Sequence, residues 1–359
     1  MHIDILTPKQ VRFFKRLIIL LEEEGNEVLV TARKYREAEE LLEMEGIQYS
    51  LAGEHGGSRL KEKLEASLNR ALELTKLVSD FHPDIVISHA SPEAARVAFG
   101  LGITHICVND SPHARAVARL TVPLSQRLLT PKVIPKKSWT KYGISSDAII
   151  RYNALDPVAW LHDAHPDSTA LDKLGLSGDK PIIVLRTEES YASYLLGHSP
   201  PSGSVVVSIV KELFSSIDDE IDLVILPRYR SQASEIRKSV PDGVKVAEHV
   251  VDSLSLLSRS SVFVGAGGTM TAEASLLGVP SISCYPGETT CIESFLIKKG
   301  LVRKISDPVK ISREITKILK NLASIRESQS EKADSILSGM EDPVQVIYRS
   351  TLDFLGKDR

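Results

Sequence analysis

The sequence lacks the features that would place it among membrane-spanning, secreted or nucleic-acid-binding proteins. It contains no run of about 20 apolar residues, the length that a helix needs to cross a bilayer. Its start, MHIDILTPKQ, enters a strand-like run directly and has neither the basic nor the apolar region of a secretory signal. The net charge of −3 gives no general attraction to nucleic acid or to an anionic membrane. We therefore expect no nucleic-acid partner and at most a peripheral membrane contact.

Cysteines and metal-binding patterns are scarce too. The 3 cysteines, Cys107, Cys284 and Cys291, include no Cys-x-x-Cys pair, and the simplest interpretation is buried thiols in a reducing cytoplasm. No His-x-x-x-His or Asp-x-Asp spacing occurs, so we expect neither a metal site nor a bound cofactor. Gly-x-x-x-x-Gly-Lys-Ser/Thr is also absent, which excludes a P-loop ATPase.

What the sequence does contain is a long α/β pattern. At 359 residues, 42% of them hydrophobic and 25% charged, the chain has a globular composition and a length that favours two domains. Short β-branched runs alternate with helical segments, and residues 131–180 interrupt the alternation. Alternation of this kind predicts parallel sheets covered by helices on both faces. The fold class expected is α/β, with two Rossmann-like domains that face a cleft.

The interruption sets the domain boundaries. We place the first domain at residues 1–160 and the second at 161–340, followed by an amphipathic C-terminal helix within 341–359. The segment from Ser58 to Phe81 predicts a long helix in the first domain. Five leucines lie near one face of that helix: Leu60, Leu64, Leu68, Leu72 and Leu77. Function is to be sought after the strands, because the carboxyl ends of parallel strands form the binding crevice.

One glycine-rich turn in the second domain suggests an anion site. In VGAGGTMTAEASLLG, a strand ends at Gly265 and a helix begins near Thr269. Gly267 and Gly268 allow a ligand to approach the backbone, and the unpaired amides at the helix start would point at a phosphate. Glu273, one turn into the helix, could accept hydrogen bonds from a ribose diol. The alternative is a close strand–helix contact that only needs small residues, with Glu273 placed favourably near a helix N-terminus.

Two arginines follow strands of the same domain. Arg186 ends IIVLR and Arg228 ends VILPR. A guanidinium suits bidentate recognition of phosphate, so the pair could neutralise a diphosphate leaving group. Either could instead be an ordinary surface charge.

The first domain contains two similar turns after its strands, VISHASPEAAR and CVNDSPHARA. Serine followed by proline is good chemistry for a helix start, so Ser91-Pro92 and Ser111-Pro112 need no function. The residues around them are less expected, since pairs of histidine and carboxylate supply general acid–base catalysis near neutral pH. Four candidates would share the crevice: His89, Glu93, Asp110 and His113.

The second-domain turn resembles the diphosphate- and ribose-binding stretch of GT-B nucleotide-sugar enzymes. These include the N-acetylglucosaminyltransferase of lipid II synthesis and the non-hydrolysing UDP-N-acetylglucosamine 2-epimerases. Over its whole length the chain is similar to an uncharacterised, largely archaeal family (DUF354-like), through VTAR, GEHGG, SHASPEAARVAFGLG, VLR and GAGGTM. The resemblance implies that Gly267, Gly268 and Thr269 hold a diphosphate and Glu273 a ribose. It also implies that the last helix packs back on the first domain.

The departures from these families matter as well. The epimerases have Gly-Asp-Thr where this chain has His89-Ala90-Ser91, which argues against 2-epimerisation, although Asp110 occupies a strand end like that of an epimerase carboxylate. Lys9 and Gln10 are no obvious replacement for the glycine-rich loop of many transferases. The lysine-rich stretch around Trp139 could touch a lipid acceptor or be an ordinary exposed loop.

Together these residues predict a cytoplasmic, metal-independent glycosyltransferase that uses a nucleotide-diphosphate sugar, expected to be a UDP sugar, and an unknown acceptor. Arg186, Arg228 and the glycine turn would stabilise departing UDP, and Asp110 or His89 would activate the acceptor. A UDP-sugar epimerase and a nucleotide-sugar-binding protein without catalysis stay open as alternatives.

Overall fold

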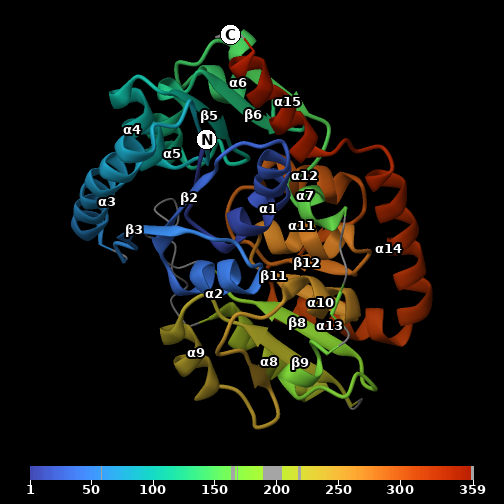
Figure 1. Cartoon of the computed structure of the whole chain (residues 1–359). Helices are drawn as coiled ribbons and strands as arrows, with labels where there is room; N and C mark the ends of the chain where they lie inside the picture. The colour runs from blue at the N-terminus through green and yellow to red at the C-terminus, as the bar shows by residue number, and fades with distance from the viewer. Residues whose placement is uncertain (58, 163–165, 168, 189–203, 217–219, 357–359) are drawn as a thin grey trace. The chain divides into compact units, whose positions relative to one another are not determined.

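The structure is a computed structural model of the chain, and it describes all residues except 58, 163–165, 168, 189–203, 217–219 and 357–359 (Figure 1). The chain divides into two compact units. Unit 1 contains Met1–His162 together with the final residues from Met340 onward. Unit 2 contains the described residues between them.

Unit 1 is built on a seven-stranded, fully parallel sheet with the order β3-β2-β1-β4-β5-β6-β7. Its strands are β1 (His2–Ile5), β2 (Leu29–Lys34), β3 (Ser50–Glu54), β4 (Ile85–His89), β5 (Thr104–Val108), β6 (Arg127–Pro131) and β7 (Ile149–Tyr152). The strand order reverses between β1 and β4, which makes the carboxyl ends of these two strands the expected ligand-binding point of the sheet.

The helices of unit 1 contact one another in two groups. The first group is α1 (Pro8–Glu23), α2 (Arg36–Met44), α7 (Val158–Leu161) and α15 (Pro343–Leu355). The second is α3 (Leu60–Phe81), α4 (Pro92–Leu101) and α5 (Arg115–Thr121), and the short α6 (Lys137–Thr140) follows β6. Right-handed crossovers in the two directions from β1 place the groups on opposite faces of the sheet.

The last helix, α15, contacts α1 and α7 of unit 1. Val344 and Ile347 are fully buried there. Arg16 of α1 pairs with Asp342 just before α15 at 2.8 Å, and the guanidinium of Arg127 lies 4.4 Å from the ring centroid of Phe354. Apolar burial and these polar contacts together attach the final segment to the sheet unit.

Helix α3 exists as predicted, but its leucines do not form the buried face. Four of them, spaced four residues apart, are 59–69% exposed, namely Leu60, Leu64, Leu68 and Leu72. The buried positions are Arg70, Leu74 and Val78. A four-residue step turns by about 40° per step around a helix, so such a row winds out of any single packing face.

Of three further local expectations, one is confirmed and two differ from the structure. Ser91-Pro92 does start α4, and the Ser91 hydroxyl accepts a hydrogen bond from the Ala94 amide at 3.2 Å. Ser111-Pro112 does not start a helix, because α5 begins only at Arg115 after a turn. Trp139 is fully buried, so it is not available to touch a lipid acceptor.

Unit 2 is a six-stranded parallel sheet with the order β10-β9-β8-β11-β12-β13. Its strands are β8 (Ile182–Arg186), β9 (Asp222–Leu226), β10 (Lys245–Val246), β11 (Val262–Gly265), β12 (Ser281–Ser283) and β13 (Val302–Lys304). Its helices are α8 (Val205–Ser216), α9 (Arg230–Arg237), α10 (Ser253–Arg259), α11 (Thr269–Leu276), α12 (Cys291–Lys298), α13 (Pro308–Lys320) and α14 (Leu322–Leu337). The order reverses between β8 and β11. The two parallel sheets confirm the predicted fold class.

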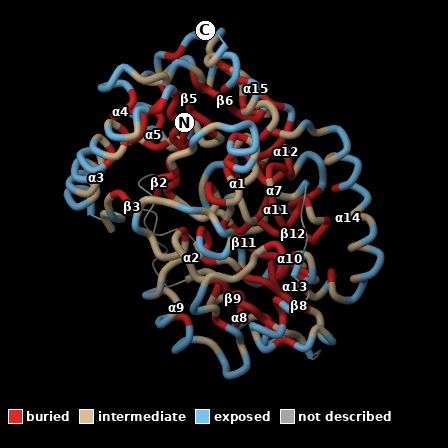
Figure 2. The backbone as a smooth tube through the Cα atoms, in the orientation of Figure 1, coloured by how far each residue is buried: buried red, intermediate tan, exposed pale blue. Residues whose placement is uncertain are grey.

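The buried parts of the backbone follow the strands in both units, whereas the outer helices are largely exposed (Figure 2). In unit 2, Ile183, Leu185 and Ile225 on one face of the sheet pack with α8 and α13 residues. Val184, Val224 and Phe263 belong to the opposite cluster with Ala274 of α11. In the described part of the chain, no helix is long and apolar enough to cross a membrane.

Candidate functional site

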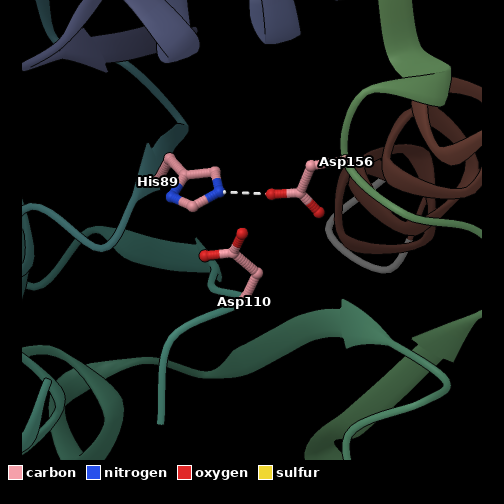
Figure 3. A group of neighbouring side chains, drawn as sticks. All are labelled: His89, Asp110 and Asp156. Atoms are coloured by element: carbon pink, nitrogen blue, oxygen red, sulfur yellow. Dashed lines mark hydrogen bonds and ion pairs between the residues drawn. The ribbon is translucent and has the colours of Figure 1, made fainter. Parts of the chain in front are cut away.

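In unit 1, four charged or titratable side chains converge near the point where the strand order reverses. Lys9 follows β1, His89 is the last residue of β4, Asp110 follows β5, and Asp156 follows β7. Three of them are drawn in Figure 3, where the carboxylates of Asp110 and Asp156 both face the His89 ring. These four residues are called the strand-end cluster below.

The contacts within the strand-end cluster are short. The Lys9 ammonium lies 2.5 Å from Asp110 Oδ2 and 2.7 Å from Asp156 Oδ2. His89 Nε2 lies 2.8 Å from the same oxygen of Asp156 (Figure 3), and the hydroxyl of Tyr152 donates to Asp156 Oδ1 at 2.6 Å. Asp156 is therefore saturated by donors, whereas Asp110 has contacts only with Lys9 and Ser111 among the described hydrogen bonds.

Burial and charge act in opposite directions in this cluster. Burial would raise the pKa of Asp156, but Lys9 and the hydrogen bond from His89 outweigh it and hold that pKa below its ordinary value. Burial would likewise lower the pKa of Lys9, and the two aspartates reverse the shift and raise it. For Tyr152, burial and the charge of Asp156 both raise the pKa. At neutral pH the cluster thus contains an ammonium and an ionised Asp156.

The surrounding sequence fixes the cluster in place. Gln10, one residue after Lys9, accepts from the Leu6 amide at 2.6 Å and donates to the His89 carbonyl at 3.0 Å, so it bridges the ends of β1 and β4. The Phe13 ring meets the His89 ring edge to face at 5.4 Å. Ala90, directly after His89, has φ of +58°, a left-handed conformation that costs a residue with a Cβ about 1–2 kcal/mol. Such strain is typical of positions held by their surroundings at functional sites.

The donor atoms of His89, Asp110 and Asp156 lie within 4.8 Å of one another, a spacing that could hold a metal ion. Lys9 places its ammonium in contact with both aspartates, so a cation already occupies the position between them. A metal would have to displace Lys9 before it could bind both carboxylates.

The remaining candidates of unit 1 are Glu93 and His113. Glu93 accepts from Ser67 at 2.6 Å and lies 3.6 Å from Arg70, and no described contact joins it to His89 or Asp110. Burial lowers the pKa of His113, while Asp110 acts in the opposite direction. The structure therefore brings His89 and Asp110 together and gives Glu93 other partners.

In unit 2, the glycine turn joins β11 to α11 beside the strand-order reversal. Gly267 and Gly268 have φ of +78° and +90°, conformations that disfavour any residue with a Cβ. A Cβ on Gly267 would lie 3.2 Å from the Tyr285 ring, and one on Gly268 would lie 3.7 Å from Arg228 Nη2. Thr269 is the first residue of α11, so the amides of its first turn have no partner within the helix.

Both predicted arginines lie at the ends of the central strands. Arg186 is the Cα partner of Gly265 across β8 and β11, and its Nη1 donates to the Pro227 carbonyl at 2.9 Å. Arg228 Nε donates to the Thr187 carbonyl at 3.1 Å, and the proximity to Gly268 puts its guanidinium next to the glycine turn. Backbone carbonyls therefore orient both guanidinium groups.

Glu273 is buried, at 3% exposure, and both of its carboxylate oxygens accept from the Ser253 hydroxyl at 3.3 Å. This long, shared bond is weaker than the usual charge-assisted bond of about 2.5–2.7 Å. A ribose hydroxyl would therefore compete with Ser253 for the carboxylate.

Comparisons with known proteins agree with this architecture. The DUF354 family, described as "Protein of unknown function", matches residues 1–355. An uncharacterized protein of Methanocaldococcus jannaschii is 31% identical over 358 residues, which cover 98% of both chains. The N-acetylglucosamine transferase of Leuconostoc mesenteroides that acts on N-acetylmuramyl-(pentapeptide) pyrophosphoryl-undecaprenol is 23% identical over 308 residues, covering 81% of this chain and 79% of that protein.

Two solved structures show the shared fold. The UDP-GlcNAc 2-epimerase of Neisseria meningitidis, bound to UDP-GlcNAc, has a TM-score of 0.69 at 17% identity and covers 98% of this chain and 100% of its own. A spinosyn rhamnosyltransferase complexed with thymidine diphosphate has a TM-score of 0.60 at 15% identity, with coverages of 98% and 100%. At these identities the likeness establishes a GT-B-like fold.

Lys9 and Asp156 were not predicted from the sequence as members of the cluster. Lys9 directly follows a strand-to-helix turn, the same signal that pointed to Asp110, but a lysine was not expected in an acid–base site. Asp156 lies in a connection after a short strand, 46 residues beyond Asp110, and only the tertiary fold brings the two together.

Proposed function

This chain belongs to the DUF354 family, and we propose that it is a glycosyltransferase that uses a nucleotide-diphosphate sugar, with UDP as the expected nucleotide. The observation that carries the proposal is the positive-φ glycine turn of unit 2, with the Arg228 guanidinium beside it and unpaired helix amides after it. Glycine turns and helix N-termini of this kind bind phosphate groups. The structural likeness to transferases and epimerases of nucleotide sugars supports the same assignment.

In the proposed reaction, the bond between the sugar's anomeric carbon and the diphosphate breaks, and its electron pair stays on the departing phosphate oxygen. Arg186, Arg228 and the amides after Gly268 balance the charge that develops there. An acceptor hydroxyl attacks the anomeric carbon and loses its proton to a base of unit 1. No metal ion is required, because guanidinium and amide groups supply the positive charge.

We assign the base to Asp110. Its side chain is 13% exposed, against 1% for Asp156, so an acceptor can reach Asp110 and not its neighbour. Asp156 holds His89 and Lys9 in position, and Lys9 forms ion pairs with both carboxylates. Glu273 is proposed to bind the ribose of the nucleotide in place of Ser253.

Ligand-induced thermal stabilisation tests the nucleotide site. A ligand that binds only the folded state stabilises it by about 2.7 kcal/mol at a hundred times its dissociation constant. We expect UDP and UDP-N-acetylglucosamine to raise the melting temperature, and NAD to leave it unchanged. Arg228→Met should abolish the shift, while Arg237→Met, which changes an exposed arginine of the same unit, should preserve it. Absence of a shift with UDP, GDP and TDP alike would contradict the proposal.

A 2-epimerase is the second candidate, favoured by the epimerase structure among the fold relatives and by a cluster able to move a proton without a second substrate. Incubation with UDP-N-acetylglucosamine alone, followed by proton NMR, separates the possibilities. An epimerase forms the 2-epimer without an acceptor, a transferase releases UDP only when an acceptor is supplied, and a binding protein does neither.

A further inference from the structure

Arg33, in β2 of unit 1, has an unusual environment for an arginine. One Nη2 hydrogen bond goes to the Leu6 carbonyl at the end of β1, at 3.1 Å. Its Nε is buried and has no hydrogen-bond partner among the described residues. Within the described part of the chain, Arg33 also forms no ion pair with a carboxylate. A guanidinium stays ionised in proteins, so this half-buried side chain brings a partly desolvated positive charge into unit 1.

Two carboxylates, Asp4 and Glu93, act electrostatically on Arg33, but both accept hydrogen bonds from other donors. Arg70 binds both oxygens of Asp4, at 3.1 and 2.5 Å. On Glu93, one oxygen accepts from Ser67, and the other accepts from Ser91 and lies 3.6 Å from Arg70. Neither acid therefore serves as a contact partner for Arg33.

The charges around Arg33 do not compensate for its burial. Burial is the main cause that lowers the pKa of Arg33, and the neighbouring Arg70 lowers it further, while Glu93 acts in the opposite direction. An unpaired buried charge destabilises a fold unless an opposite charge arrives from elsewhere. The fold thus retains a cation whose partner is not among the described side chains.

A stacked pair of rings begins next to Arg33. Its guanidinium carbon lies 5.9 Å from the ring centroid of Tyr35, and that ring stacks on His55 at 5.6 Å. His55 belongs to the loop between β3 and α3, and its Nδ1 accepts from the Gly57 amide at 3.1 Å. A Cβ on Gly56 would lie 2.6 Å from the Lys63 backbone, so the loop is packed closely against α3. VTAR lies in β2 and GEHGG begins at the end of β3, and these two strands pair side by side.

We propose that Arg33, beside the Tyr35 ring that stacks on His55, is the centre of an oxyanion site in unit 1 that takes the carboxylate or phosphate group of a small ligand. The planar guanidinium can donate from Nε and a terminal nitrogen to two oxygens of one group, which satisfies the buried Nε and neutralises the charge. This site is separate from the nucleotide site proposed for unit 2, and it does not depend on that proposal.

NMR of the full chain labelled with ¹⁵N-arginine tests the site directly. The Nε–H signal of Arg33 is assigned from its absence in Arg33→Lys. Phosphate and, separately, acetate are titrated at ionic strength held constant with KCl. We expect the Arg33 signal to move saturably with at least one anion, while that of Arg36 does not. A response to phosphate alone identifies a phosphate-bearing ligand, and one to acetate alone a carboxylate.

Variants then give the size of the effect. Arg33→Gln should weaken binding of the responding anion by about tenfold or more. Arg33→Lys keeps the charge but loses the planar guanidinium, so it should weaken binding less. Arg36→Gln, a matched change in α2, should leave binding unchanged. UDP-induced stabilisation of the same samples reports unit 2 separately. An Arg33 signal unmoved by both anions, or equal binding by Arg33→Gln and the wild type, would overturn the proposal and leave Arg33 as a structural link to Leu6.

Discussion

The two units share a sheet architecture but differ in what they bury. Below the carboxyl edge of unit 1 lies a continuous set of buried polar groups, in which Thr31 joins His2 to Asp4 and Arg70 binds Asp4 from α3. The interior of unit 2 is formed mainly by aliphatic side chains, and its predicted arginines bind backbone carbonyls at the edge of the sheet. The same fold can therefore support a site either through a network of buried charges or through backbone geometry.

The difference has a physical consequence for each unit. A network of buried charges is sensitive to loss of any one partner and to pH, since each member exists to satisfy another. A site made from a glycine turn and backbone amides is insensitive to pH near neutrality and sensitive to added side-chain bulk. Changes in unit 1 should therefore alter chemistry and stability, whereas changes in the turn of unit 2 should alter ligand binding.

The largest effect is expected from Asp110→Asn in unit 1. Removal of the proposed base should reduce turnover by roughly 100- to 10,000-fold, because general base catalysis contributes that much. UDP-induced stabilisation should stay unchanged, because the nucleotide is assigned to unit 2. Turnover is measured as UDP release and binding as a thermal shift. Retention of more than a tenth of the wild-type rate would remove Asp110 from the mechanism.

Arg70→Met comes next, because it leaves the Asp4 carboxylate buried without its partner. Burial would raise the pKa of Asp4, but Arg70 now holds it at about 2. Breaking such a pair costs about 3–5 kcal/mol of unfolding free energy. Hydrogen exchange, followed separately for peptides of each unit, should locate the loss in unit 1. Arg237→Met, an exposed position of unit 2, provides the control. An equal loss of unfolding free energy in the two variants would contradict the proposed difference between unit 1 and unit 2.

Acidification should also destabilise unit 1 selectively. Burial lowers the pKa of His2 to about 4 and that of His105 to about 3, from an ordinary value of 6.5. Because the folded pKa is depressed, the stability is present above pH 6.5 and is lost as the pH falls towards the folded values. Between pH 7 and pH 5, each of these two histidines should lower the free energy of unfolding by about 2 kcal/mol. His105→Gln should remove about 2 kcal/mol of the loss of unfolding free energy that hydrogen exchange detects in unit 1 between pH 7 and pH 5. An unchanged pH dependence would contradict this assignment.

The smallest effect on stability, and the most selective one on binding, is expected from glycine substitutions in unit 2. Gly268 and Gly243 have similar φ of +90° and +97°, so alanine should cost about 1 kcal/mol of unfolding free energy at either position. Only Gly268→Ala should also lose UDP-induced stabilisation, since Gly243 lies in a turn with open space around it. If both variants bound UDP equally, the glycine turn would be a strand–helix contact without a ligand.

Local sequence signals predicted much of the fold. Alternation of strand and helix patterns led correctly to two parallel α/β sheets, and the Ser91-Pro92 start of α4 is confirmed. The helix start predicted from the same dipeptide at Ser111-Pro112 was wrong, because the chain forms a turn there before α5 begins. The long helix α3 is also confirmed, but its leucine row is largely exposed, since apolar spacing by itself does not reveal which face of a helix packs on the sheet.

Site residues could be predicted from the sequence only where a residue ends or directly follows a recognisable strand. His89, Asp110 and the glycine turn were found in this way, and their roles stay predictions. Lys9 became meaningful only once Asp110 and Asp156 were seen on either side of it, a contact across 101 and 147 positions of the chain. Arg33 was inconspicuous, because the lack of a carboxylate partner among the described residues is visible only in the folded structure.

The position of α15 has a consequence for biosynthesis. Its partners α1 and α7 leave the ribosome before any of unit 2, whereas Val344 and Ile347 are translated only after unit 2. At about 5–20 residues per second, the nascent first unit exposes the apolar surface that these side chains will cover for roughly ten seconds or longer. Transiently exposed apolar surface of this kind is prone to aggregation, and the first unit becomes complete only after the second has been translated.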